Sequence, residues 1–284
     1  MTIPEPMSTQ APPREAAHPR TIAFTSGKGG VGKSSLVLNT GLALRRRGQR
    51  VAILDGDLGL ANLHVLLGLA PRFDLRHVVS GERRLGQVIL RGPLGLSIIP
   101  AASGVAALAD LDDGARQRLL AQLDEVASTV DYLLIDTGAG LSPTVLSLVL
   151  AADEAIVVTR PEPTALADAY ALMKVVVLQE RSYPFHLLVN MARDAEEARQ
   201  IHDGLAAILM RFLSYRPGNA GHVLDDPAVA RAVVEQVPFV VKVPTCPAAV
   251  AVDGLAAGLL GGPAVVRPDT TFWERVLRWG ARAT

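Results

Sequence analysis

The sequence of 284 residues is poor in cysteine, carries no net charge and lacks long apolar runs. Its one cysteine, Cys246, excludes a disulfide within the chain and a metal site built on a cysteine pair, and it fits a reducing cytoplasm. Because 28 basic residues balance 28 acidic ones, no overall field attracts nucleic acid, and we expect no specific nucleic-acid partner. No apolar run reaches the roughly 18 residues of a membrane span, so we expect any membrane contact to be peripheral.

Apolar residues make up 49% of the chain and charged residues 20%, which indicates a folded globular protein. From residue 20 onward, short apolar strands alternate with helical stretches. This alternation predicts an α/β fold, with a mostly parallel sheet and helices on both faces. After a first strand that begins at Thr21, the expected strands cover residues 50–54, 94–99, 131–136, 155–159 and 186–190.

The chain is expected to divide into four segments. Residues 1–19 contain five prolines and no periodic apolar pattern, which predicts a disordered tail. Residues 20–260 are the expected α/β domain. A linker is expected over residues 261–268, and an amphipathic helix over residues 269–284.

The stretch from Thr21 to Ser35 has the order of strand, glycine-rich turn and helix start that is typical of a P-loop. Its glycines let the backbone approach a phosphate, so that successive N–H groups point at the anion. We expect Lys33 to reach the β- and γ-phosphates of a nucleotide, Ser34 to coordinate Mg²⁺, and Ser35 to lie near the α-phosphate. The residues expected to bind the nucleotide are Gly27, Lys28, Gly29, Gly30, Val31, Gly32, Lys33, Ser34 and Ser35.

Acidic residues follow two of the expected strands. Asp55 and Asp57 come directly after the strand at 50–54, and Asp136 ends the strand at 131–136. Ligands sit beyond the carboxyl ends of strands in doubly wound sheets, so Asp55 and Asp57 are placed for a magnesium nucleotide. A pair of turn aspartates would have the same spacing. An aspartate in the position of Asp136, downstream of a P-loop, is the Walker B arrangement that holds Mg²⁺ through water.

The run from Gly27 to Ser34 (Gly-Lys-Gly-Gly-Val-Gly-Lys-Ser) resembles the deviant Walker A motif of the MinD/ParA family, which has an extra lysine, here Lys28. The resemblance covers about residues 20–260. It implies an ATPase that forms a sandwich homodimer when ATP is bound, with Lys28 reaching the partner's nucleotide. It also implies that turnover is slow until a partner protein completes the site.

The same resemblance implies roles for further residues. The stretch from Asp55 to Leu63 looks like the family's first switch, in which Asp57 orients the attacking water and assists near the metal while Asp55 supports the metal shell. The segment that follows Asp136 resembles the second switch, and Asn190 resembles an asparagine that contacts adenine. The expected catalytic residues are Lys28, Lys33 and Asp57, and the expected metal residues are Ser34, Asp55, Asp57 and Asp136.

Within that family, the chain resembles the FlhG/FleN branch, which is linked to flagellar number and placement. The matching stretches are residues 56–62, 190–192, 226–233 and 246–249. The branch implies a flagellar or transcriptional regulator protein as partner. One departure concerns the Asp-Gln-Ala-x-x-Leu-Arg segment by which many FlhG proteins stimulate their GTPase partner FlhF, because residues 1–20 lack it.

The amphipathic helix expected over residues 269–284 contains both tryptophans of the chain. Large apolar side chains opposite arginines are typical of a helix that lies in a membrane interface, so we expect this helix to bind an anionic membrane surface. A terminal helix docked on the core is the alternative. At about 100° per residue, Phe272, Trp273, Val276, Leu277 and Trp279 share the apolar side, and Arg275, Arg278 and Arg282 the polar side.

The sequence therefore predicts a cytoplasmic ATPase that regulates flagellar number or placement and lies peripherally at the inner face of the cell membrane when ATP is bound. One alternative is a nucleotide-gated module that sequesters a transcription activator. Another is a MinD/ParA-type ATPase that positions a different cargo or the division machinery. The iron–sulfur branch of the superfamily would need bridging cysteines, and Cys246 alone does not supply them.

Overall fold

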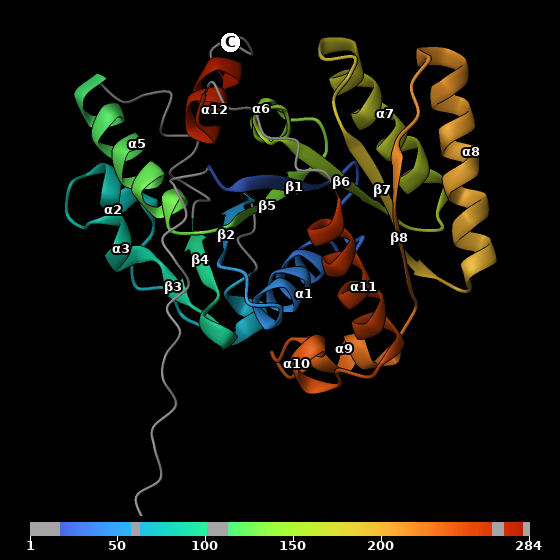
Figure 1. Cartoon of the computed structure of the whole chain (residues 1–284), viewed down its shortest axis with the longest axis horizontal. Helices are drawn as coiled ribbons and strands as arrows, with labels where there is room; N and C mark the ends of the chain where they lie inside the picture. The colour runs from blue at the N-terminus through green and yellow to red at the C-terminus, as the bar shows by residue number, and fades with distance from the viewer. Residues whose placement is uncertain (1–17, 58–62, 101–112, 263–269, 281–284) are drawn as a thin grey trace, which may run out of the picture.

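The computed structural model describes residues 18–57, 63–100, 113–262 and 270–280. Within these residues, one eight-stranded sheet has the order β3-β4-β2-β5-β1-β6-β7-β8 (Figure 1). Its neighbouring strands run parallel except for β3 and β4, so the expected mostly parallel α/β sheet is confirmed. The strands are β1 (Arg20–Ser26), β2 (Val51–Gly56), β3 (Leu90–Arg91), β4 (Ser97–Pro100), β5 (Tyr132–Ala139), β6 (Glu154–Thr159), β7 (Phe185–Ala192) and β8 (Gly218–Leu224).

Helices cover both faces of this sheet (Figure 1). One face packs mainly against α1 (Lys33–Arg46), α9 (Pro227–Val234), α10 (Phe239–Lys242) and α11 (Pro247–Gly261). The other face packs against α2 (Leu75–Val79), α3 (Leu85–Val88), α5 (Asp113–Ser128), α6 (Pro143–Ala151), α7 (Pro163–Gln179), α8 (Ala195–Leu213) and α12 (Phe272–Gly280). Short 3₁₀ turns occur at Val65–Leu67 and Pro93–Gly95.

The sequence pattern misses β3 and β8 and misplaces the start of β4. β8 reads Gly-Asn-Ala-Gly-His-Val-Leu, and its two glycines and polar residues give little strand propensity. The strand expected at residues 94–99 begins only at Ser97. Leu94 lies in the preceding 3₁₀ turn with a left-handed φ of 55°, far from the extended backbone of a regular strand.

The register of the central strands brings the expected site residues to one edge of the sheet. Asp55 in β2 pairs with Asp136 in β5, and Phe24 in β1 pairs with Asp136 from the other side. The glycine-rich turn follows β1 at Gly27. Because these strands are parallel, the turn and the two aspartates meet at the carboxyl edge, where α/β sheets bind ligands.

The other expected segments are described only in part. Residues 1–17 of the expected tail and residues 263–268 of the expected linker lie outside the described residues. The described part of the chain contains no helix that is long and apolar enough to cross a bilayer. The C-terminal helix is present as α12, which packs against α6 and α5 (Figure 1).

Candidate nucleotide site

Two positions in the P-loop must be glycine, because neighbouring atoms leave no room for a Cβ atom. A Cβ atom on Gly27 would lie 2.2 Å from the backbone carbon of Asp168 in α7. A Cβ atom on Gly32 would lie 2.3 Å from Nδ2 of Asn190, and Gly32 also has a left-handed φ of 86°. Since only glycine avoids these contacts, the loop can pack directly against α7 and β7.

Side chains beneath the loop hold some of its carbonyl groups. The Ser26 hydroxyl donates to the carbonyl of Lys28 at 2.9 Å, and the Asn190 amide donates to the carbonyl of Val31 at 2.8 Å. Carbonyls held in this way leave the N–H groups of the loop for an anion. Asn190 thus supports the loop, and its expected adenine contact remains a prediction.

Lys33, the first residue of α1, forms a buried ion pair with Asp136 in β5. The Lys33 ammonium donates to Oδ1 of Asp136, and 7% and 1% of the two side chains are exposed. Burial raises the pKa of Asp136, and the positive charge of Lys33 opposes that rise. The lysine is therefore held beneath the loop by the acid.

Two buried carboxylate oxygens, one within this pair and one next to it, have no hydrogen-bond partner among the described residues. They are Oδ1 of Asp55 and Oδ2 of Asp136. Burial, followed by the charge of Asp136, raises the pKa of Asp55 to about 7. The Ser34 side chain lies close enough to Asp136 to lower the pKa of that carboxyl group. A hydroxyl and one or two carboxylates form the protein part of a typical Mg²⁺ site, with phosphates and water supplying the other ligands. These residues therefore fit Mg²⁺.

The described residues contain no group of three or more histidine, cysteine, aspartate or glutamate side chains that could hold a metal by themselves. Asp57 lies just beyond β2, near the second expected switch. A Cβ atom on Gly138 would lie 3.7 Å from the Oδ1 atom of Asp57. The rest of the first switch, residues 58–62, lies outside the described residues.

Lys28 lies on the exposed rim of the loop and is held by its own chain. Its ammonium donates to Oε2 of Glu162 at 3.2 Å and to the Thr164 hydroxyl at 2.9 Å. Arg160 donates to the other oxygen of Glu162 and, at 3.4 Å, to the carbonyl of Gly30. The sequence reasoning missed Arg160, Glu162 and Thr164. The available signal was their position just after β6, at the carboxyl edge of the sheet.

The C-terminal helix does not expose its apolar side. Phe272, Trp273 and Val276 are buried in the same core as α5 and α6, and 1% of Trp273 is exposed. Leu277 and Trp279 are partly buried against that core. In this structure the apolar side of α12 is docked on the core, as in the alternative, and binding of this helix to a membrane remains a prediction. Docking satisfies the same apolar pattern because the core buries it as a bilayer would.

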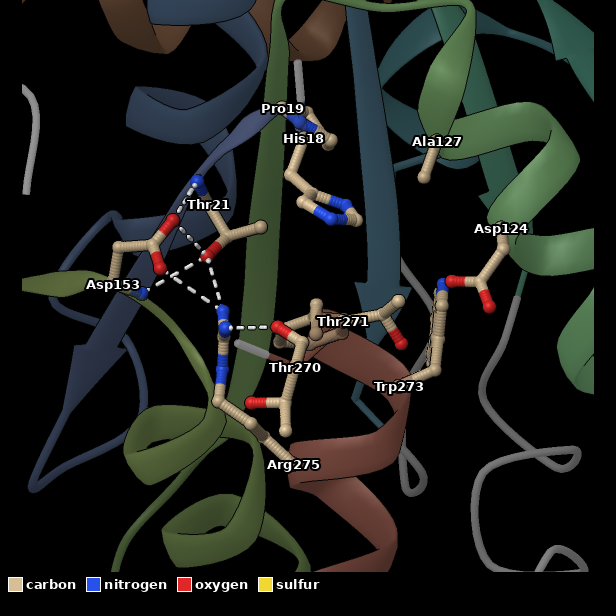
Figure 2. Close-up of a pocket in the computed structure, with 11 residues that line it drawn as sticks. His18, Pro19, Thr21, Asp124, Ala127, Asp153, Thr270, Thr271, Trp273 and Arg275 are labelled. Atoms are coloured by element: carbon tan, nitrogen blue, oxygen red, sulfur yellow. Dashed lines mark hydrogen bonds and ion pairs between the residues drawn. The ribbon is translucent and has the colours of Figure 1, made fainter. Parts of the chain in front are cut away.

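Arg275 is also placed differently from the expectation. Its guanidinium is buried and donates to Oδ1 of Asp153 at 2.9 Å and to the carbonyls of Ala151 and Thr270 at 2.6 and 2.7 Å, as Figure 2 shows for Asp153 and Thr270. Asp153 in turn accepts two hydrogen bonds from Thr21. The cause is the helix geometry, since Arg275 lies only about 60° from Phe272 around the axis and so flanks the buried face. Of the other expected arginines, Arg278 is exposed and Arg282 lies outside the described residues.

A parallel strand, a glycine-rich loop that ends in lysine, a helix, and an aspartate on the neighbouring strand define a P-loop nucleoside triphosphatase. A family model described as ParA, NUBPL iron-transfer P-loop NTPase, matches residues 18–193. The chain belongs to the ParA family of P-loop NTPases.

Individual relatives agree with this assignment. The antiactivator FleN of Pseudomonas aeruginosa is 40% identical over 220 residues, which cover 77% of this chain and 79% of FleN. The flagellum site-determining protein YlxH of Helicobacter pylori is 35% identical over 184 residues, or 65% of this chain and 62% of YlxH. The resemblance to the MinD/ParA family and its FlhG/FleN branch is thus confirmed.

Solved structures of MinD have the same fold. MinD in the MinC:MinD complex of Aquifex aeolicus has a TM-score of 0.68 at 25% identity, covering 86% of this chain and 96% of that one. MinD of Pyrococcus horikoshii, complexed with Mg-ADP, has a TM-score of 0.67 at 26% identity, covering 87% and 99%. ATP and Mg²⁺ are confirmed as the expected cofactors.

Proposed function

We propose that this protein is an ATPase that dimerises when ATP is bound, associates with the membrane and regulates flagellar number or placement. Similarity to FleN and YlxH supports the flagellar role, and similarity to MinD supports the ATP-driven cycle. The observation that carries the proposal is the pair of P-loop lysines. Lys33 lies buried beneath the loop, while Lys28 lies on its exposed rim, where a second copy could bring its own nucleotide.

The residues of the site suggest how ATP would be handled. The phosphates would bind to the N–H groups of the loop, and Lys33 would leave Asp136 to bind the β- and γ-phosphates. Ser34, Asp55 and Asp136 would hold Mg²⁺, which offsets phosphate charge when it is bound.

Hydrolysis would then depend on two further residues. Asp57 would orient the attacking water, and Lys28 of the second copy would offset the charge that develops on the γ-phosphate. Because that lysine comes from the partner copy, the separated protein would turn over slowly. This slow step would make the protein a timer for whatever it regulates.

Membrane association would require α12 to leave its docked position. Release would expose Phe272, Trp273 and Val276 and separate Arg275 from Asp153. Each of these apolar side chains contributes roughly 1.5–3 kcal/mol when fully buried, so contact with lipid would have to replace what the core supplies. Avidity of two helices in one ATP-bound dimer, about 10²–10⁴-fold, would then favour an anionic membrane at the inner face of the cell membrane.

The proposal is tested by light scattering and by counting flagella. With ATP and Mg²⁺ the wild-type protein should show twice the monomer mass, and with ADP it should not. In a strain that lacks the gene, the wild-type gene should restore normal flagellar number and placement, and a Lys33→Ala gene should not. A protein that stays monomeric with ATP, or a deletion strain with normal flagella, would contradict the proposal.

A second candidate function is sequestration of a transcription activator, with hydrolysis serving only to reset the protein. The similarity to a protein named as an antiactivator favours this candidate. An Asp57→Ala variant that binds ATP without hydrolysing it separates the two. Sequestration alone predicts that this variant keeps repressing the activator's target genes, while an ATPase cycle predicts that regulation is lost.

A further inference from the structure

Glu162, the residue just before α7, holds two cations with one carboxylate. Its Oε2 atom accepts from Lys28 at 3.2 Å, and its Oε1 atom accepts from the guanidinium of Arg160. The backbone N–H of Glu162 also donates to the Arg160 carbonyl at 2.7 Å, so a tight turn sets the two side chains together. In the ion pair between Arg160 and Glu162, 33% of the Arg160 side chain and 34% of the Glu162 side chain are exposed.

Arg160 also reaches the P-loop itself. One guanidinium nitrogen donates to the carbonyl of Gly30 at 3.4 Å and lies 4.0 Å from the sulfur of Met191. The other nitrogen carries the contact to Glu162. Because a guanidinium holds its donors in a fixed planar fork, Arg160 fixes the position of Glu162 relative to the loop.

The charges of this cluster determine what happens when Lys28 moves. With both cations present, one carboxylate faces two positive charges, so Lys28 competes with Arg160 for Glu162. If Lys28 leaves, Arg160 still neutralises Glu162 and still holds it to Gly30. Without Arg160, departure of Lys28 would leave the carboxylate with no other ion pair to the described residues, so the lysine would be held more tightly.

We propose that Glu162 retains Lys28 in the separated protein, and that Arg160 is the positioning residue that takes over Glu162 as Lys28 moves to the nucleotide of a second copy. Arg160 thereby lowers the dissociation constant of the ATP-bound dimer without touching the reacting atoms. The predicted effect of Arg160 on assembly rests on the proposed ATP-bound dimer. The retention of Lys28 by its own chain rests on the contacts described here.

The expected size of the effect follows from the symmetry of a dimer. An ion pair with this exposure changes an equilibrium by about threefold, because solvent screens it. Two lysines must leave when two chains assemble, so the effects multiply. Losing Arg160 should therefore weaken the ATP-bound dimer by about tenfold, and losing the Glu162 charge should strengthen it by a similar factor.

The first experiment measures the dimer dissociation constant by sedimentation with ATP and Mg²⁺ in Asp57→Ala protein, so that hydrolysis does not interfere. We expect a rise of about tenfold for Arg160→Gln and a fall for Glu162→Gln. The double variant should behave like Glu162→Gln. Arg199→Gln, which removes an exposed arginine paired on α8, is the matched control and should change nothing.

A purely structural role for Arg160 at Gly30 predicts something different. It would weaken ADP binding, and the double variant would remain as weak as Arg160→Gln alone. Calorimetry with ADP and Mg²⁺ therefore accompanies each sedimentation run. Unchanged dimerisation in Arg160→Gln, or a double variant that is not rescued, overturns the proposal.

A second experiment is independent of dimerisation. The nucleotide-free protein is labelled with limiting acetic anhydride, and the reaction of the Lys28 amine is followed by mass spectrometry. We expect faster labelling in Glu162→Gln and slower labelling in Arg160→Gln, each by about threefold. Equal rates overturn the retention of Lys28. If wild-type protein never dimerises while labelling behaves as expected, the proposed dimer fails and the retention stands.

Discussion

The ammonium of Lys33 donates to the carboxylate of Asp136, and the two side chains are almost completely buried beneath the glycine-rich loop. The lysine that should bind phosphate and the acid that should hold Mg²⁺ through water therefore neutralise each other before either ligand arrives. Neither charge is buried alone, which matters because an isolated buried charge is strongly destabilising. We expect a magnesium nucleotide to replace both partners at once: the phosphates would replace Asp136 beside Lys33, and the metal would replace Lys33 beside Asp136.

The first prediction concerns this pair. Lys33→Ala should abolish ATP binding and should also lower the free energy of unfolding by roughly 3 kcal/mol, because Asp136 is left buried without its cation. Calorimetry and urea denaturation measure the two effects. The double variant Lys33→Ala/Asp136→Asn should recover most of the stability and none of the binding. ATP affinity like that of the wild type in Lys33→Ala would contradict the P-loop assignment.

The second prediction is a pH dependence that comes from Asp55. Its pKa is about 7 in the folded protein and 3.8 in the unfolded chain. Between about pH 4 and pH 7 the folded protein keeps a proton that the unfolded chain releases, so stability should fall as the pH rises through this window. The loss is at most about 4 kcal/mol. Denaturation without Mg²⁺ or nucleotide should show this slope, and Asp55→Asn should flatten it. The same slope in both proteins would refute the prediction.

The third prediction concerns Asp57, which should act after binding. Asp57→Ala leaves the loop and Lys33 intact, so ATP should still bind, while the attacking water loses its carboxylate. We expect phosphate release to fall at least about 100-fold and light scattering to show a lasting dimer. Undiminished phosphate release, or a monomer in ATP, would count against this role.

The fourth prediction separates Lys28 from Lys33. Lys28→Ala should bind ATP nearly as well as the wild type, because Lys28 lies on the rim and its partners are Glu162 and Thr164. It should fail to dimerise and to hydrolyse ATP. Arg199→Ala, an exposed change on α8, is the control. If Lys28→Ala turns over like this control, Lys28 is only a solvated loop residue.

The fifth prediction concerns the docking of α12. Arg275→Ala leaves Asp153 buried without its cation and should favour release of the helix. Sedimentation with anionic liposomes should then show binding without ATP, whereas wild-type protein should need ATP. Trp273→Glu in the Arg275→Ala background should remove the binding. If the Arg275→Ala protein remains folded and does not sediment with the liposomes, the helix packs on the core and does not bind membrane.

The P-loop and its acidic residues could be predicted because their pattern lies in short stretches of the sequence. Gly27 to Ser34 follow one another in the chain, and Asp55 and Asp136 each end an apolar strand, so strand order alone brings them to one edge. The partners of Lys28 could not be found in this way. Glu162 is 134 residues away, and the pairing of β6 with β1 and the packing of α7 against Gly27 bring the two side chains together.

The state of α12 could not be predicted for a different reason. An apolar stripe suits a bilayer and a protein core equally well, so amphipathicity alone does not choose between them. The choice depends on whether the core offers a complementary surface. Here Asp153 supplies the partner that Arg275 needs, and those two residues are 122 positions apart.

Both tryptophans of the chain lie on α12, and one of them, Trp273, is buried where the helix docks. The protein thus carries its own optical probe of that helix, because tryptophan emission shifts to longer wavelength when the indole ring leaves the apolar core for water. Nucleotide, lipid and pH could each be titrated in one cuvette, and the colour of the emitted light would report where the C-terminal helix lies without any added label.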